Sequence, residues 1–268
     1  MKLRVLSAAL LLPVVFGLIL GGGWLLRGLI TVTVLLAGLE YVQMLHRKGY
    51  KLSLPLLWGT ILLWLAAVIW PDSRWLEIGL PLIMLVGCAW QLFHCDDKDP
   101  TATWALTLAG GLYLGIGGAY LLRLRALPDG LWWILTALPG VWIADSGAYF
   151  VGRKWGRHKI APHISPGKSW EGYAAEIVTG LLGGYLLGTL WPWVAGQPLT
   201  LTPWRGLWLG GLLAALTPLG DFFVSMIKRE VGVKDSGKLI PGHGGAFDRL
   251  DSLLWAGILT WWFVQSLG

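Results

Sequence analysis

Hydrophobic positions along the chain are grouped into long runs, separated by short breaks that contain glycine, proline or charged residues. Each run approaches the roughly 20 apolar residues that a helix needs to cross a hydrocarbon core about 30 Å thick. The pattern predicts nine transmembrane helices, at residues 5–21, 24–45, 54–70, 75–93, 103–122, 131–151, 173–193, 207–226 and 252–267. The predicted fold class is therefore an all-α polytopic integral membrane protein.

The first predicted helix follows a basic start, as in a signal peptide. No polar stretch that ends in a small-residue cleavage site comes after it, so we expect it to be retained. The glycines at residues 21–23, followed by Trp24, predict either a kink in one tilted helix or a tight turn between two helices.

Composition agrees with the hydropathy pattern, since 55% of the 268 residues are hydrophobic and only 13% are charged. The 19 tryptophans suit anchors at the membrane surface. These values exclude a soluble globular domain. We predict one membrane domain over residues 1–268, with N-terminal helices in 1–140 and the catalytic helices and loops in 141–268.

The basic residues are unevenly divided between the two sides of the predicted topology. Of the 21 Lys and Arg residues, sixteen fall in the N-terminal segment and alternate connections, and five fall on the opposite side. The positive-inside rule then places the N-terminus in the cytoplasm and the C-terminus outside. We expect a multi-pass protein of the cell (inner) membrane whose two longest polar connections, residues 144–172 and 219–251, face the cytoplasm.

Each polar connection begins with an aspartate at the end of an apolar run, Asp145 in the first and Asp221 in the second. A carboxylate at that depth is costly, which favours a functional site. The alternative is a structural ion pair with Lys or Arg.

A second pair of carboxylates, Asp248 and Asp251, lies in the motif DRLD before the last predicted helix. Their spacing places both on one helix face. Asp251 could instead be only a helix cap. Asp221 and Asp248 together offer hard oxygen ligands of the kind that hold Mg²⁺ with phosphates, rather than Zn²⁺.

The glycines of PGHGG, residues 241–245, would let the backbone present N–H groups to an oxyanion. His243 could donate to phosphate, act as a base or be a plain loop residue. The nearby run GVKDSGKL fits part of a P-loop motif, but Leu239 stands where Ser or Thr is needed, and we reject that interpretation.

The run SMIKREVGVKDSGKLIPGHGGAFDRLD, residues 225–251, resembles the signature of the phosphatidate cytidylyltransferases, the CDP-diacylglycerol synthases. It matches S-x-x-K-R, K-D-x-G, P-x-H-G-G and D-R-x-D in identity and spacing, with one departure at Ala246. Residues 145–172 resemble the family's other polar block, and residues 1–140 resemble it in hydropathy. The resemblance implies transfer of a cytidylyl group from CTP to phosphatidic acid with Mg²⁺, giving CDP-diacylglycerol and diphosphate at the cytoplasmic face.

Under this resemblance we assign Asp221 and Asp248 as the main Mg²⁺ ligands, with Asp145 and Asp251 for a second cation or its outer shell. The other catalytic candidates are Lys228, Arg229 and His243. The substrate-binding candidates are Lys168, Ser225, Lys234, Asp235, Lys238, Gly244, Gly245 and Arg249. The basic residues among them would hold CTP phosphates, Ser225 could add an oxygen ligand, and Asp235 could instead cap a turn.

Two other functions remain open at this point. A CTP-dependent lipid kinase, acting on a polyprenol or diacylglycerol, would need the same metal-binding and phosphate-binding groups. It would transfer the γ-phosphoryl group and so cut the nucleotide at a different bond. An ion-coupled transporter would place carboxylates at a broken helix such as LTPLGD, residues 216–221, although no inverted repeat is visible. The expected partners are CTP, phosphatidic acid and the bilayer, a homodimer is compatible with the sequence, and no nucleic acid is expected.

Overall fold

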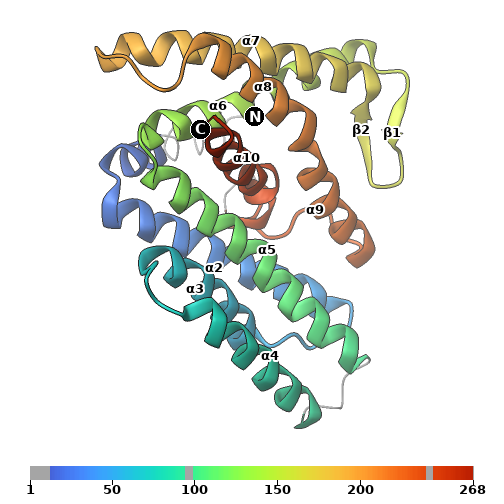
Figure 1. Cartoon of the computed structure of the whole chain (residues 1–268). Helices are drawn as coiled ribbons and strands as arrows, with labels where there is room; N and C mark the ends of the chain where they lie inside the picture. Colours follow the sequence, from blue (N-terminus) through green and yellow to red (C-terminus); the bar gives the residue numbers. More distant parts are fainter. Residues whose placement is uncertain (1–12, 94–98, 240–243, 268) are drawn as a thin grey trace. The chain divides into compact units, whose positions relative to one another are not determined.

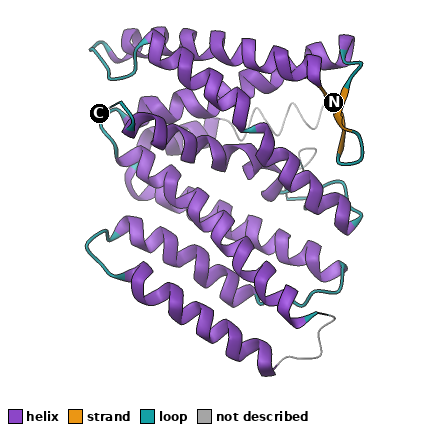
Figure 2. Cartoon of the chain, turned by 45° about the vertical axis from the view of Figure 1, so that its right-hand side comes forward, coloured by secondary structure: helices purple, strands orange, loops and turns teal. Residues whose placement is uncertain are grey.

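The computed structural model describes residues 13–93, 99–239 and 244–267. Its elements in chain order are α2 (Gly23–Arg47), α3 (Leu54–Ile69), α4 (Trp75–Phe93), α5 (Pro100–Ala126), α6 (Gly130–Trp155), β1 (Lys159–Ala161), β2 (Ser165–Ser169), α7 (Trp170–Ala195), α8 (Pro203–Leu216), α9 (Pro218–Val231) and α10 (Phe247–Gln265) (Figure 1). Figure 2 shows how far helices dominate, with the hairpin β1–β2 in orange as the strand structure of the described residues.

The chain forms two compact units. Unit 1 comprises Met1–Leu122 and Ile227–Leu250, and unit 2 comprises Arg123–Met226 and Asp251–Gly268. The polar run after α9 thus belongs to the unit that contains the N-terminal helices. The prediction of a single membrane domain stays a prediction.

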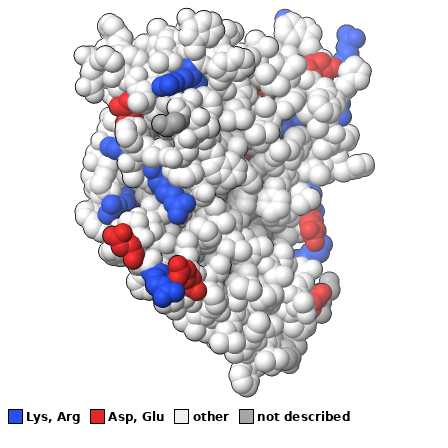
Figure 3. All heavy atoms as spheres, in the orientation of Figure 1, with Lys and Arg blue, Asp and Glu red and all other residues white. Residues whose placement is uncertain are grey.

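Six helical segments in the described part of the chain are long and apolar enough to cross a membrane: α2, α4, α5, α6, α7 and the segment Pro203–Val231, which holds α8 and α9. The helix α3 is apolar but shorter. Much of the face shown in Figure 3 carries neither positive nor negative side chains. A multi-pass helical membrane protein fits these helices, whereas the count of nine and the sidedness remain predictions.

Within unit 1, α3 packs against α2 and α4. The hydroxyl of Tyr41 on α2 donates to the carbonyl of Leu106 on α5, at 3.1 Å. On α4 only Gly87 is buried, and large side chains such as Leu85 and Phe93 are exposed, as expected for a helix whose surroundings are lipid.

Within unit 2, α7 packs closely along both α6 and α8. The α7–α8 contact depends on glycines, since a Cβ added at Gly184 would collide with the carbonyl of Gly206 and a Cβ at Gly206 would collide with that of Gly184. Small residues at such contacts let two membrane helices approach backbone to backbone.

The helix predicted at residues 207–226 lies within Pro203–Val231, a helical segment long enough to cross a membrane, which the structure divides into α8 and α9 at Thr217. Pro218 follows the break at Thr217, and proline both lacks an N–H and clashes with the preceding turn of a helix. Near the N-terminus, residues 13–21 are helical, and α2 starts after Gly22, whose φ is 58°. The first part of the predicted helix 5–21 lies outside the described residues.

The first polar connection is also more structured than predicted. The helix α6 continues to Trp155, and α7 starts at Trp170. Between them stands an antiparallel hairpin in which Lys159 pairs with Ser169 and Ala161 with Ser165. The strands are too short and too rich in Ser, Pro and Gly to show a strand pattern in sequence, so the all-helical prediction missed them.

Candidate functional site

In unit 2, Asp221 lies in the first turn of α9, where Lys168 and Ser225 contact its carboxylate. Its Oδ2 is 2.7 Å from Nζ of Lys168, and its Oδ1 accepts a hydrogen bond from Ser225, one turn later, at 3.2 Å. The side chains of Asp221 and Lys168 are 30% and 24% exposed, so the ion pair is partly open to solvent. A phosphate could therefore reach the ammonium.

The hairpin positions Lys168. Figure 1 shows that β2 leads directly into α7, and Ser169, at the junction, caps that helix by accepting a hydrogen bond from the N–H of Gly172 at 3.2 Å. The ammonium of Lys168 also lies 4.6 Å from the ring centroid of Phe222. A rigid junction on one side and an aromatic ring on the other restrict where the ammonium can point.

Two further carboxylates interact with this ion pair. Glu176 on α7 is only 4% exposed, and its Oε1 has no hydrogen-bond partner in the described structure. It interacts electrostatically with Asp145, Lys168 and Asp221. We refer to Asp145, Lys168, Glu176, Asp221 and Ser225 as the Asp221 cluster.

In unit 1, Asp248 is 5% exposed, and four donor groups of the described residues lie within hydrogen-bond distance of its carboxylate. Its Oδ1 accepts from Nζ of Lys228 at 2.7 Å. Its Oδ2 accepts from both the N–H and the hydroxyl of Ser236, at 2.8 and 2.9 Å, and from the N–H of Gly245 at 3.0 Å. The hydroxyl of Ser236 is also 2.8 Å from Oε2 of the buried Glu40 on α2.

We call these residues, Glu40, Lys228, Ser236, Gly245 and Asp248, the Asp248 cluster. Burial by itself acts to raise the pKa of Asp248. The hydrogen bonds from Lys228 and from two backbone N–H groups outweigh burial, so the pKa lies below its usual range and the carboxyl is ionised at neutral pH. With Oδ2 surrounded by three donors, Oδ1 is the oxygen that retains acceptor capacity for a further ligand.

The remaining predicted residues of the second polar run are distributed over the surface of unit 1. The side chains of Arg229, Lys234, Asp235, Lys238 and Arg249 are exposed. Gly244 adopts a φ of +82°, which suits glycine. His243 lies outside the described residues, so its predicted role stays a prediction.

Asp251 lies in unit 2, one turn beyond Phe247, the first residue of α10. The alternative that it merely caps this helix is therefore wrong, because a cap residue precedes the first turn. The backbone of α9 at Gly220 packs against the carbonyl of Asp251, which brings Asp251 close to the start of α9 within unit 2.

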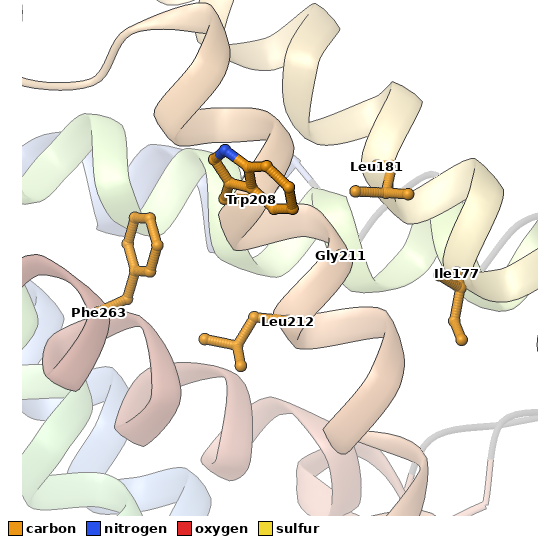
Figure 4. A pocket seen from close by; sticks show the side chains of 6 residues that line it. All are labelled: Ile177, Leu181, Trp208, Gly211, Leu212 and Phe263. Atoms are coloured by element: carbon orange, nitrogen blue, oxygen red, sulfur yellow. The ribbon is translucent and has the colours of Figure 1, made fainter.

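An apolar groove of about 460 Å³ also lies in unit 2, between α7, α8 and α10. Figure 4 shows its lining side chains, Ile177 and Leu181 on α7, Trp208, Gly211 and Leu212 on α8, and Phe263 on α10. None of these side chains carries a charge, so the groove cannot neutralise a triphosphate.

Comparison with known proteins decides between the functions that the sequence left open. The model of the cytidylyltransferase family matches residues 2–267. The chain belongs to this family. It is similar to a phosphatidate cytidylyltransferase of Mycobacterium bovis, with 33% identity over 252 residues that cover 87% of this chain and 78% of the relative. It is also similar to proteins of that name from Synechocystis sp., 32% identical over 98% of this chain and 96% of the relative, and from Staphylococcus epidermidis, 33% identical over 95% of both.

The cytidylyltransferase match includes the N-terminal 140 residues, which on sequence alone resemble the family only in hydropathy. The structure explains why the family match extends over these N-terminal helices. In this cytidylyltransferase the N-terminal helix α2 carries Glu40, which contacts the polar run that holds Asp248. The polar run and the N-terminal helices form one unit.

The carboxylates of the two clusters are the type of donor that Mg²⁺ prefers. Among the described residues, no three His, Cys, Asp or Glu side chains converge to hold a metal ion by themselves. Mg²⁺ commonly takes only one or two carboxylates from a protein and completes its shell with water and substrate phosphates. Oδ1 of Asp248, which keeps acceptor capacity beside Lys228, and the partly exposed Asp221 fit that mode of binding.

Sequence reasoning missed Glu176, Glu40 and Ser236. The signal for both glutamates was present, because each is a carboxylate inside an apolar run, which is the argument that selected Asp145 and Asp221. Ser236 carried no such signal, since a serine in a polar loop is ordinary.

Proposed function

We propose that this chain is a phosphatidate cytidylyltransferase that makes CDP-diacylglycerol and diphosphate from CTP and phosphatidic acid. The similarity to proteins of that name along nearly the whole chain carries the proposal. The two clusters support it, because each holds a carboxylate beside a lysine ammonium, the side chains that a reaction between two phosphate-bearing substrates needs.

In the proposed reaction a phosphate oxygen of phosphatidic acid forms a bond to the α-phosphorus of CTP. The bond from that phosphorus to the oxygen bridging to the β-phosphate breaks, and diphosphate leaves with the electron pair. The attacking phosphate is already ionised at neutral pH, so no base has to remove a proton. The barrier is then dominated by charge repulsion and by alignment of the two substrates.

Lysine ammonium groups meet the charge requirement. Lys168 is held at a defined position by the hairpin and Phe222, and partial exposure leaves it accessible to a phosphate of CTP. The exposed Arg229, Lys234, Lys238 and Arg249 would attract the triphosphate and hold its outer phosphates. Lys228 serves differently, because it is buried against Asp248 and fixes the orientation of that carboxylate.

We propose Asp221 and Asp248 as Mg²⁺ ligands, with Asp145 and Asp251 near a second cation. Bound Mg²⁺ would neutralise phosphate charge and favour departure of diphosphate. Ser236 and Gly245 keep Oδ2 of Asp248 occupied, which directs its other oxygen toward any ligand.

We further propose that the reaction takes place at the cytoplasmic face of the cell (inner) membrane. The excess of Lys and Arg in the same connections that carry Asp145, Asp221 and Asp248 supports this side. CTP is a soluble nucleotide and phosphatidic acid is a lipid, so the phosphates would meet at headgroup depth. Pairing with a second copy of the chain stays a prediction.

The kinase and the transporter are not favoured by the similarities. A break in a helix does occur at Thr217–Pro218, as a transporter would require. Nevertheless, a proline alone accounts for such a break.

Position-specific labelling of CTP tests the proposal. Purified protein would be incubated with phosphatidic acid, Mg²⁺ and CTP that carries ³²P at either the α- or the γ-phosphorus, and the lipid product would be identified by mass spectrometry. We expect the α-label in CDP-diacylglycerol and the γ-label in diphosphate. Replacing phosphatidic acid by diacylglycerol should give no labelled lipid. A γ-label on a lipid would instead establish a kinase, and intact CTP with every lipid would reject both enzymes.

A further inference from the structure

Glu40 is a buried carboxylate in the apolar helix α2, with a relative exposure of 7%. An acidic side chain at such a position is costly unless its oxygens are well bonded. The donors to Glu40 come from far along the chain. The hydroxyl of Ser236 lies 2.8 Å from Oε2, and the N–H of Phe247 donates to the same oxygen at 3.0 Å.

Both donors border Asp248. Phe247 precedes it directly as the first residue of α10. Ser236 donates its N–H to Oδ2 of Asp248, and its hydroxyl lies between Oδ2 and Oε2 of Glu40, at 2.9 and 2.8 Å. A serine hydroxyl has a single proton, so it can donate to only one of these two oxygens at a time while it lies within hydrogen-bond distance of both.

Two glycines provide the space for the carboxyl group of Glu40. A Cβ added at Gly237 would collide with Oε1, and a Cβ added at Gly245 would collide with Oε2. The backbone therefore surrounds this carboxyl group within the turn that presents Asp248.

We infer that Glu40 is a positioning residue for the transfer reaction, which holds Ser236 and the start of α10 so that Asp248 keeps one orientation. Glu40 acts through Ser236 and Phe247 rather than on a substrate. The inference rests on the proposed function and extends it to a residue of the N-terminal helices. Helix α2, which hydropathy identifies only as an apolar helix, thereby has a role in the transfer reaction.

The test compares Glu40→Gln with Glu77→Gln, which makes the same change at an exposed glutamate of α4 in unit 1. We expect Glu40→Gln to lower kcat about 10- to 100-fold, the usual effect of losing a residue that orients a ligand. Because Glu40 acts through Asp248, the KM for CTP should change by less than about threefold. Glu77→Gln should match the wild type.

Hydrogen–deuterium exchange provides a readout that does not depend on turnover. In Glu40→Gln the amide of Phe247 should exchange faster, and in Glu77→Gln it should exchange as in the wild type. Ser236→Ala tests the path to Asp248. The double variant Glu40→Gln/Ser236→Ala should lose less activity than the product of the two single losses, because both changes disrupt the same connection.

Any of four results would overturn the inference. One is a kcat of Glu40→Gln equal to that of Glu77→Gln, and another is a loss that disappears when activity is expressed per folded molecule. The third is a double variant whose loss equals the product of the single losses. If Glu40→Gln does not fold, Ser236→Ala alone must show the fall in kcat and the faster exchange at Phe247. A wild-type protein that makes no CDP-diacylglycerol rejects the proposed function itself, whereas unchanged exchange at Phe247 rejects the positioning by Glu40.

Discussion

The ammonium of Lys228 lies 2.7 Å from Oδ1 of Asp248, and the two side chains are only 11% and 4% exposed. A buried pair of this kind is costly to break from one side, because the remaining charge stays buried. Three more donors surround Oδ2 of Asp248, so the carboxylate is fixed on both oxygens. This ion pair therefore contributes to the stability of unit 1, and it also fixes the carboxylate that we propose as a Mg²⁺ ligand.

Replacing Lys228 by methionine should destabilise the protein by about 3 kcal/mol, the lower end of the range for a broken buried pair, since Asp248 keeps its other donors. The apparent melting temperature in detergent would measure the loss. Lys238→Met removes an exposed lysine of the same unit and serves as the control. Equal melting temperatures for the two variants would show that the buried pair contributes nothing to stability.

Replacing Asp221 or Asp248 by asparagine should leave a folded, membrane-inserted protein and abolish Mg²⁺-dependent turnover. We expect a fall on the order of 100-fold or more, the scale at which losing a single charge-stabilising contact affects a transition state. Activity should be measured over a range of Mg²⁺ concentrations. The matched control is Asp72→Asn, at an exposed aspartate in the turn after α3.

Chelation of divalent cations should inactivate the wild type, and added Mg²⁺ should restore it. Wild-type turnover in either asparagine variant would remove that aspartate from the proposed metal site. Turnover that persists in excess chelator would reject the role of Mg²⁺ altogether.

Replacing Glu176 by glutamine should raise the melting temperature and lower activity. Glu176 is hydrogen-bonded to Asp145, its Oε1 is buried without a partner among the described residues, and Asp145 and Asp221 act on it as like charges. An amide group could donate to a neighbouring carboxylate, which should gain about 1 kcal/mol, or roughly 2–4 °C in a chain of this size. Thermal scans would measure the melting temperature, and the CTP-labelling assay would measure the activity of the same variant.

Glu77→Gln provides the comparison for this effect, because its carboxylate is exposed beside Arg74 and the change should alter neither quantity. A lower melting temperature for Glu176→Gln would contradict the prediction. It would show that the buried carboxylate is stabilised by Lys168 more than it is opposed by its acidic neighbours.

Replacing Gly184 by alanine should destabilise unit 2, because the new methyl group would collide with the carbonyl of Gly206 across the α7–α8 contact. We expect a loss of about 1–3 kcal/mol, as for other overpacked sites. Gly140→Ala is the control, since no atom of the structure lies near a Cβ at that position of α6. There the added methyl should be neutral or stabilising by up to about 1 kcal/mol. Equal stability of the two variants would mean that α7 and α8 can separate at no cost.

The sequence predicted most of what depends on local composition. Long apolar runs identified the helices, and the polar run that holds Asp221 and Asp248 identified the family, which the similarities confirmed. The contact of Lys168 with Asp221 could not be derived, because it depends on a hairpin whose strands carry no strand pattern. Glu40 could have been selected as a carboxylate inside an apolar run, but its contacts could not be derived. These contacts are with Ser236 and Phe247, and no spacing rule links residues that lie so far apart in the sequence.

The distance along the chain between Glu40 and its partners bears on how the protein is made. Glu40 precedes Ser236 by 196 residues and Phe247 by 207 residues. At a synthesis rate of roughly 5–20 residues per second, Ser236 leaves the ribosome roughly 10–40 s after Glu40. During that time α2 carries an acid whose donors do not yet exist. A chain released before residue 236 would keep this buried carboxyl group without either donor.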